Sequence, residues 1–410
     1  MSKAVFFIYG SIRINLYKTL SLYYRQQGYD ITFVVDNKFA SDVFSSENAE
    51  ILRYRIYNVL SNKIEDGEIN SAAFTNSIDI DVDKYSMDHA KNIYSETFNI
   101  LDSLNLNKSD IVFGGSGLHI QDLAIKQYKH RTYNTLFSEI SNIPGKTFFD
   151  PLGANVISNF YNKEEIDPAC AKRYSKVEFD KWREEQKKIK SSASFIPLQS
   201  KTSSMYSYIS STFKDLCFGY SSVAALKLLR FSPNLLYSFL KKKHNNRSSD
   251  NDLGEIEGNY LFHPLQVSTD TQLLYNSDYD NLSSIAYYRN MAIKLGLSLV
   301  VKYHPAETNQ KLKSEIYSYC NENNITISKD NTIDLIVNSE MVGVNNSTVG
   351  LEAILLNKKV TFIGKTFYRK LTNKNWLYYY LFDYLVDIDF FSGKSKSDIF
   401  NHLQRLSNQR

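Results

Sequence analysis

Residues 4–35, AVFFIYGSIRINLYKTLSLYYRQQGYDITFVV, decide the fold class. The apolar run at residues 4–9 precedes a helical pattern through Leu16, Leu20 and Tyr24, which Gly28 closes. A second apolar run follows at residues 31–35. A strand, a helix and a further strand in this order form a βαβ unit with parallel strands. The sequence therefore predicts an α/β fold.

The same alternation of strands and helices continues in two blocks. Further strands at residues 51–57, 110–113, 135–137 and 146–149, with a helix at 85–104, complete a first Rossmann-like domain over residues 1–160. Strands at residues 260–266, 298–303, 325–327, 341–344 and 359–363 predict a second one over residues 258–375. Two such domains place a cleft between two sets of strand ends, where the ligands of α/β sheets bind.

Residues 161–257 differ in composition from both domains and predict a helical, basic and aromatic connection between them. Apolar residues such as Phe213 mix there with basic ones, and the segment ends in Lys241, Lys242, Lys243 and Arg247. This mixture suits an interfacial helix on an anionic membrane surface, and equally a packed helical insertion with a solvated basic end. Residues 376–410 form a last block, which we expect to be a helical tail.

Composition excludes several classes of protein. The 48 Lys+Arg and 44 Asp+Glu among 410 residues leave a net charge of +4, which is too small for a generic nucleic-acid binder. Cys170, Cys217 and Cys320 fit neither a disulfide framework nor a zinc ribbon, which favours a reducing compartment. The first apolar run is too short for a signal peptide, and no apolar run approaches the ~18 residues that span a bilayer. We expect a cytoplasmic or peripheral membrane protein.

The strongest local signal for chemistry is VNNSTVGLE, residues 344–352. A strand leads through a polar turn into a helix, so Ser347 or Thr348 falls at the N-cap. Free backbone N–H groups, the helix dipole and two hydroxyl groups would then meet at one point, which suits a phosphate. The alternative is a plain Ser/Thr cap.

Two further strand ends in the second domain carry polar side chains. Lys302 and His304 follow an apolar strand that Pro305 stops, so both could reach a ligand, although a loop histidine without function fits the pattern as well. Asp270 lies between Gln266 and Gln272 after the strand at residues 260–266. It predicts either a nucleophile or base, or an N-cap or Asx-turn aspartate.

The first domain offers weaker candidates. Glu139 stands at a strand end, and Gly115 and Ser116 belong to a Gly-rich turn that lets a ligand approach the backbone. Asp150 and Asn155 follow the next strand. The spacing of the glycines at residues 114–117 is not that of a dinucleotide-binding fingerprint, so NAD binding is not expected.

Two acidic patterns, residues 79–83 and 387–389, alternate carboxylates in a way that can hold a hard cation. Their positions beside expected helices favour capping or solvent exposure instead. No metal site is predicted from them.

Together, these motifs resemble the capsule polysaccharide biosynthesis family of bacterial Kdo transferases, which use CMP-Kdo. The resemblance is carried by Gln266 with Asp270 and Gln272, by the strand end with Lys302, His304 and Pro305, and by Asn346-Ser347-Thr348 with Gly350 before a helix. A glycine followed by an aromatic residue, at residues 364–368, also resembles the family. In the first domain, Asp150 and residues 153–155 fit, whereas residues 138–140 keep one acid, Glu139, and lack the family's glycine.

The resemblance implies a GT-B-like fold with an acceptor-side first domain and a second domain that binds the CMP-sugar. It implies a retaining glycosyltransferase that moves Kdo to a lipid or glycan acceptor in capsule or O-polysaccharide assembly, peripheral on the inner membrane. No cofactor is required, because protein groups would neutralise the donor phosphate. The implied catalytic groups are Asp270 as nucleophile, Glu139 as acid/base, and His304. The candidate donor-binding groups are Gln266, Gln272, Lys302, Asn346, Ser347, Thr348 and Glu352. On the acceptor or sugar side the resemblance points to Asp150 and Asn155, and the Gly-rich turn adds Gly115 and Ser116.

Two other functions remain open on the sequence. Another CMP-sugar transferase, such as a sialyltransferase-like enzyme, would show similar recognition of cytidine phosphate. A noncatalytic membrane adaptor of polysaccharide assembly could keep the fold, although Asp270 and His304 are both present.

Overall fold

The computed structural model describes residues 1–61, 79, 85–128, 132–166, 177, 179–184, 205–230, 254–395 and 397–409. The chain divides into two compact units, each discontinuous in sequence. The first unit comprises Met1–Lys163, Lys201–His244 and Tyr384–Arg410, and the second comprises Glu164–Ser200 and Asn245–Asp383. The helices at residues 205–230, which we expected in a separate connection, thus cluster with the first unit.

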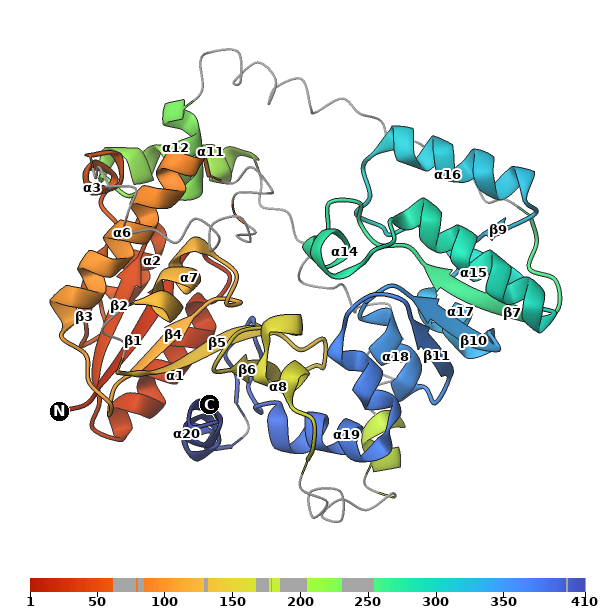
Figure 1. Ribbon diagram of the computed structural model, residues 1–410. Helices are drawn as coiled ribbons and strands as arrows, with labels where there is room; N and C mark the ends of the chain where they lie inside the picture. Colours follow the sequence, from red (N-terminus) through yellow and green to blue (C-terminus); the bar gives the residue numbers. More distant parts are fainter. Residues whose placement is uncertain are drawn as a thin grey trace. The chain divides into compact units, whose positions relative to one another are not determined.

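A six-stranded sheet forms the centre of the first unit (Figure 1). Its strands, in the spatial order β3-β2-β1-β4-β5-β6, are β3 (Glu50–Arg53), β2 (Asp30–Val35), β1 (Lys3–Ile8), β4 (Ile111–Gly114), β5 (Asn134–Ile140) and β6 (Thr147–Asp150). All neighbours are parallel except β5 and β6. Residues 4–8 are buried without interruption, as expected for a parallel strand covered on both faces.

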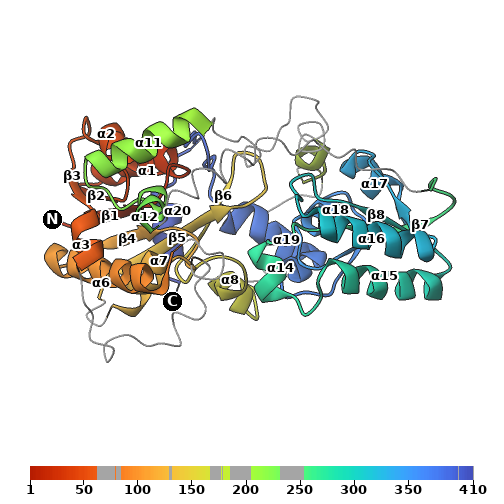
Figure 2. The ribbon, with the colours of Figure 1, turned by 90° about the horizontal axis from the view of Figure 1, so that it is seen from above.

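Helices cover both faces of this sheet. Phe6 pairs in register with Phe33 and Phe113, and its ring stacks on that of Phe113 with centroids 4.6 Å apart. On that face, Tyr17 packs on Phe6 at 5.5 Å. The alternate residues of β1, such as Val5, join a core cluster with the helices of the opposite face. Figure 2 shows α1 and α2 on one face and α6 and α7 on the other.

The helical elements of the first unit are α1 (Ile14–Gln26), α2 (Lys38–Phe44), α3 (Ile56–Ser61), α6 (Met87–Leu104), α7 (Ile120–Gln127), η1 (Asn155–Ile157), α8 (Asn159–Asn162), α11 (Met205–Cys217), α12 (Val223–Arg230) and α20 (Phe400–Ser407). The C-terminal segment, from Tyr384 to the start of α20, packs on this unit. Val386 bridges to Thr147, the Tyr384 hydroxyl donates to Asp150 at 2.5 Å, and the Phe400 ring lies 5.0 Å from that of Tyr24.

The second unit contains a five-stranded, fully parallel sheet. Its spatial order is β11 (Lys359–Phe362), β10 (Met341–Val344), β7 (Tyr260–Pro264), β8 (Ser298–Lys302) and β9 (Thr326–Ile327). Its helical elements are α14 (Thr271–Asn276), α15 (Asn281–Leu295), α16 (Gln310–Glu322), α17 (Thr332–Asn338), α18 (Val349–Leu355), η4 (Phe367–Thr372) and α19 (Lys374–Tyr378), followed by a π-helical stretch, Tyr379–Tyr384. The prediction of two Rossmann-like α/β units is confirmed.

In each sheet, the chain first adds strands on one side of the central strand and later adds them on the other side, which defines a topological switch point. In the first unit the chain builds β2 and β3 on one side of β1 and then adds β4 on the other side. In the second unit it builds β8 and β9 on one side of β7 and then adds β10 on the other. Ligands of open α/β sheets bind outside the carboxyl ends of the strands at such switch points. The loops after β1 and β4, and those after β7 and β10, are therefore the places to look for sites.

Among the described helices, none is long and apolar enough to cross a membrane.

Candidate functional site

The loop after β7 carries Asp270 at the start of α14. Its Oδ1 accepts a hydrogen bond from the backbone N–H of Gln272 at 2.8 Å, so Asp270 is the N-cap of this helix. The backbone N–H of Asp270 donates to the carbonyl of Val267 at 2.9 Å and closes the turn. The side chain is half-buried. The cap uses one carboxylate oxygen, and the proposed catalytic role of Asp270 stays a prediction.

Four amides join the two loops at the switch point of the second unit. Gln266 Nε2 donates to Asn346 Oδ1 at 3.0 Å, across the β7 and β10 strand ends. Asn346 Nδ2 donates to the carbonyls of Gln272 at 2.7 Å and Asn276 at 3.1 Å. Asn276 Nδ2 in turn donates to Gln272 Oε1 at 2.9 Å. The structure thus brings three predicted donor-binding residues together, but as partners of one another that hold the loops in place.

The helix α18 begins at the end of this loop. Thr348 is its N-cap residue, but its hydroxyl makes no capping bond. Ser347 Oγ instead accepts from the N–H of Val349 at 3.2 Å. Glu352 places a carboxylate in the first turn, where it already complements the helix dipole and lowers the local attraction for a second anion. The predicted phosphate role of Ser347 and Thr348 stays a prediction.

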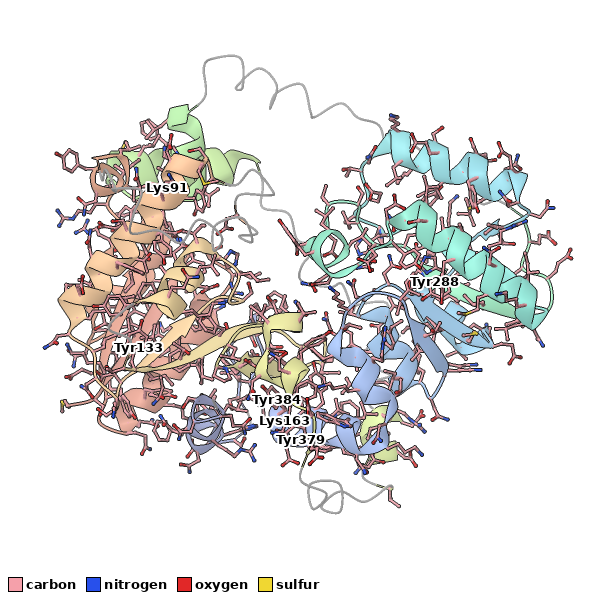
Figure 3. The ribbon with its side chains drawn as sticks, viewed as in Figure 1. Lys91, Tyr133, Lys163, Tyr288, Tyr379 and Tyr384 are labelled. Carbon is pink, nitrogen blue, oxygen red and sulfur yellow. The ribbon has the colours of Figure 1, made fainter. Side chains whose placement is uncertain are left out.

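Tyr288 of α15 fixes the strand that leads into this loop. Its hydroxyl donates to the carbonyl of Val344 at 2.7 Å, and its ring occupies the space beside Gly343, where an added Cβ would lie 2.3 Å from the ring (Figure 3). Only glycine fits at Gly343 without displacing the ring. The position of Asn346, two residues after Val344, therefore depends on this contact.

The end of β8 carries Lys302 and His304. Lys302 Nζ donates to the backbone carbonyls of Lys329, at 3.0 Å, and Asp330. This side chain, which was predicted to bind the donor, therefore bonds to the backbone of its own unit. His304 Nδ1 accepts from the N–H of Ala306 at 3.1 Å, which leaves the proton of the neutral ring on Nε2. Burial lowers the pKa of His304, while the charges of Asp270 and Glu307 oppose this shift. The Nε2–H group of His304 is suited to donate to an anion.

In the first unit, Glu139 lies near the end of β5 beside a residue that the sequence did not single out. Arg13, in the loop after β1, is buried and donates from Nε to Ser138 Oγ and from Nη2 to the Ser138 carbonyl, both at 3.1 Å. Its guanidinium is 4.0 Å from a Glu139 oxygen. The only signal for Arg13 in the sequence was its place just after the first strand. A buried cation at the switch point can hold an acidic substrate group as well as Glu139.

The Gly-rich turn after β4 packs on the loop after β6. The carbonyl of Ser116 accepts from the N–H of Ala154 at 2.7 Å, and a Cβ on Gly117 would lie 2.6 Å from the Cα of Gly153. Gly117 has a φ of +86°, a conformation that favours glycine. The structure therefore brings the predicted segments at residues 115–117 and 150–155 together.

Asp150 is fully buried at the base of this second loop. It accepts from the N–H groups of Leu152 at 2.8 Å, Gly153 at 3.2 Å and Phe160 at 3.1 Å, and from the hydroxyl of Tyr384. Burial raises the pKa of Asp150, and these hydrogen bonds oppose the shift. Its contacts are those of a carboxylate that shapes the loop. Asn155, a few residues on, adopts a left-handed φ of +55° and its carbonyl accepts from Ser158 Oγ at 2.5 Å.

The two acidic patterns differ from each other in the structure. Asp79 does not face solvent: it is buried, with Oδ1 3.0 Å from His119 Nδ1, and its Oδ2 accepts from the N–H of Ile120 at the start of α7 at 3.1 Å. Residues 80–84 lie outside the described residues. Asp387 is exposed and pairs with Lys146, as solvent exposure predicts. Among the described residues no group of three or more His, Cys, Asp or Glu side chains could hold a metal ion.

A cavity of about 470 Å³ lies elsewhere in the first unit, beside the edge strand β3. Its walls include Arg53, Arg55, Asn58, Glu96 and Asn99. None of the residues predicted for the site lines it, so the switch points remain the better candidates.

Fold and site together define an α/β protein with two Rossmann-like units, in which the predicted binding and reacting residues lie at or near strand ends. Residues 177–377 match the sequence profile of the family described as capsule polysaccharide biosynthesis protein. This match confirms the family resemblance over the part of the chain that contains Gln266, Asp270, His304 and Asn346. A comparison with curated protein sequences found no match.

Solved structures with a similar course of the chain include KpsC of Thermosulfurimonas dismutans, a beta Kdo 2,7 transferase, with 13% identity, full coverage of both chains and a TM-score of 0.42. The beta Kdo 2,4 transferase of the same KpsC matches with 15% identity over 71% of this chain and 86% of that one, at a TM-score of 0.34. The UDP-GlcNAc 2-epimerase of Methanocaldococcus jannaschii matches with 11% identity over 100% of this chain and 94% of that one, at a TM-score of 0.29. Similarities at this level say nothing about substrate, and the family match is that of the sequence profile over residues 177–377.

Proposed function

We propose that the protein is a glycosyltransferase that moves Kdo from CMP-Kdo to a lipid or glycan acceptor in polysaccharide assembly. The observation that carries the proposal is the amide network that joins Gln266 and Asn346 at the switch point of the second unit, beside Asp270 and inside the matched family region. An acid, a neutral imidazole with Nε2–H and buried amides are the groups that a sugar-phosphate donor requires.

The proposed reaction is a double displacement with retention. The Asp270 carboxylate attacks the anomeric carbon of Kdo, and CMP leaves with the electron pair of the broken C–O bond. The Nε2–H of His304 stabilises the charge that develops on the phosphate. An acid/base group, for which the family resemblance nominates Glu139, then takes the proton of the acceptor hydroxyl as the acceptor oxygen displaces Asp270.

The test uses two variants of Asp270 that separate catalysis from capping. Asparagine is as good an N-cap as aspartate, so Asp270→Asn should fold normally and bind CMP while losing turnover. Asp270→Ala should lose turnover and also about 1 kcal/mol of stability, because the cap is lost. Incubation with CMP-Kdo or CMP-sialic acid, followed by mass spectrometry, also decides which donor is used. Near-normal turnover of Asp270→Asn would reduce this residue to a helix cap.

We also propose transfer without a divalent cation, because His304 and the loop after β10 supply donors for the phosphate. Transfer should continue in EDTA and gain nothing from added magnesium or manganese. Loss of activity in EDTA that magnesium restores would contradict this.

Peripheral binding to an anionic membrane is part of the proposal. In α11 and the turn after it, Phe213 and Phe218 are 65% and 57% exposed, and Lys214 lies beside them. Exposed aromatic and basic groups on one helix end favour a membrane interface. The basic run at residues 241–247 lies outside the described residues. Phe213→Ser with Phe218→Ser should reduce sedimentation with phosphatidylglycerol vesicles, whereas Tyr57→Ser, which also removes an exposed aromatic residue, should not.

A further inference from the structure

The cavity beside β3 has the size and the walls of a small-molecule site. Its volume of about 470 Å³ falls within the range of ligand pockets, roughly 300–1,000 Å³. One wall is β3 with the start of α3, and Figure 1 shows both at the same side of the first unit as α6. The other wall is one stripe of α6, in which Glu96, Asn99, Ile100 and Ser103 recur at helical spacing. The strand β2 separates β3 from β1, so this cavity is not the switch point of the sheet.

Two arginines in this cavity have no acidic partner among the described residues. Arg53 ends β3 and Arg55 follows it, and both are exposed. The guanidinium of Arg53 lies over the ring of Tyr220, with Cζ 5.6 Å from the ring centroid. This cation–π contact positions the guanidinium and leaves N–H donors for a planar acid group. A carboxylate is the group that fits such donors best, because two parallel hydrogen bonds can form.

The wall on α6 supplies groups that suit hydroxyls. Glu96 is 5% exposed, and its Oε1 accepts from Asn58 Nδ2 at 2.6 Å. Its Oε2 accepts from Asn99 Nδ2 at 3.5 Å. The two amides thus hold the carboxylate in place from both sides. Carboxylate and amide oxygens accept hydrogen bonds and amide nitrogens donate them, so together they can satisfy several hydroxyl groups of one ligand.

The charge of the walls limits the class of ligand. Two guanidinium groups and one carboxylate leave a single positive charge, which a monoanion balances. A phosphate dianion would exceed that charge and would be repelled by Glu96. Ile51, Leu52 and Ile100 add apolar surface, which suits the C–H face of a sugar ring. A sugar with one carboxylate combines the acid, the hydroxyls and the apolar face that these walls require.

We propose that this cavity binds an acidic saccharide unit, with its carboxylate on Arg53 and Arg55 and its hydroxyls on Glu96, Asn58 and Asn99. The inference goes beyond the proposed function, because it adds a saccharide site at β3 that no step of the proposed transfer uses. The two proposals can therefore fail separately.

The experiment measures binding to the full chain by titration calorimetry, without any sugar donor. The probe is cellobiouronate, a disaccharide that carries one carboxylate. Cellobiose, which has a hydroxymethyl group in place of the carboxylate, tests the need for the acid. Inorganic phosphate tests whether any anion suffices. Because no donor is present, the outcome does not depend on glycosyl transfer, which the CMP-Kdo assay measures separately.

We expect cellobiouronate to bind at least about 10-fold more tightly than cellobiose or phosphate, because charge-assisted hydrogen bonds are among the strong ones. Arg53→Gln and Arg55→Gln should each weaken cellobiouronate binding by about 10-fold. Arg53→Lys keeps the charge but lacks the planar donor fork, so it should also weaken binding. Asn99→Ala, at an exposed position, should weaken binding of both disaccharides. Arg289→Gln removes an arginine of α15 in the second unit and should bind like wild type.

Four results would overturn the inference. Equal binding of cellobiouronate and cellobiose would show that the acid is not recognised. Phosphate binding as tight as that of cellobiouronate would make the cavity a general anion site. Unchanged affinity in both Arg→Gln variants would place the saccharide elsewhere, and a wild-type chain that binds no cellobiouronate has no such site. Thermal melts identify a misfolded variant, and Arg53→Lys then carries the test in its place.

Discussion

Replacing Asn346 with alanine tests whether the amide network holds the second unit together. Asn346 is 5% exposed, and its side chain makes three hydrogen bonds: with Gln266 Nε2 at 3.0 Å, with the Gln272 carbonyl at 2.7 Å and with the Asn276 carbonyl at 3.1 Å. Each bond contributes about 1 kcal/mol net, and a buried partner left without a bond costs about 1–3 kcal/mol. We therefore expect Asn346→Ala to lower the free energy of unfolding of this unit by about 3–5 kcal/mol.

The position of the tryptophans makes the assay selective. Trp182 and Trp376 both belong to the second unit, so tryptophan fluorescence during guanidinium unfolding reports on that unit. Hydrogen exchange of Thr271–Asn276 reports on the loops locally, and it should accelerate in the variant. Asn338→Ala, at an exposed position of α17, is the matched control and should change stability by less than about 0.5 kcal/mol. If Asn346→Ala is as stable as this control, the network does not brace the site, and Asn346 is available to bind the donor directly.

Three further changes have definite expected outcomes. Burial lowers the pKa of His263 from 6.5 to about 4, so the unfolded chain binds the proton more tightly than the folded one. As pH falls from 6.5 to 4, the free energy of unfolding of the second unit should therefore fall by about 3 kcal/mol. Unfolding followed by tryptophan fluorescence at successive pH values measures this, and a free energy that does not change with pH would disprove it. Tyr384→Phe removes a hydrogen-bond donor to buried Asp150, so the pKa of Asp150 should rise further. Calorimetry should show the first unit destabilised by about 1.5–3 kcal/mol. An unchanged melting temperature would show that the contact is unimportant. Gly117→Ala adds a Cβ 2.6 Å from the Cα of Gly153 at a positive φ, so it should lower the stability of the first unit by more than about 1 kcal/mol in the same assay. Gly145→Ala, at a similar φ but with open space around the added Cβ, should lower it less.

Apolar periodicity predicted the sheets well because parallel strands are buried on both faces. The strand predicted at residues 341–344 coincides with β10, and the run at residues 4–9 differs from β1 by one residue at each end. The strand predicted at residues 51–57 ends early, at Arg53, because α3 begins at Ile56. The antiparallel pairing of β6 follows from the six residues between β5 and β6, which are too few for a parallel crossover.

The candidate site was harder to predict because its contacts join distant segments. Gln266 and Asn346 were recognised as polar residues at strand ends, but nothing local shows that two amides 80 positions apart bond to each other. Arg13 has the sequence context of an exposed loop residue, and only the fold buries it against Ser138. The acidic pattern at residues 79–83 was expected to cap a helix or face solvent, because nothing local shows that Asp79 has a partner, His119, 40 positions away.

The return of the chain to its first unit sets an order in which the protein can be made. Tyr384, which bonds to Asp150, is synthesised 234 positions after it, and the whole of Asn245–Asp383 emerges from the ribosome in between. The second unit therefore has all its strands before the first has its final hydrogen bonds. An interrupted chain would carry a finished second sheet and an unfinished first unit, because Tyr384 and α20 are synthesised after both.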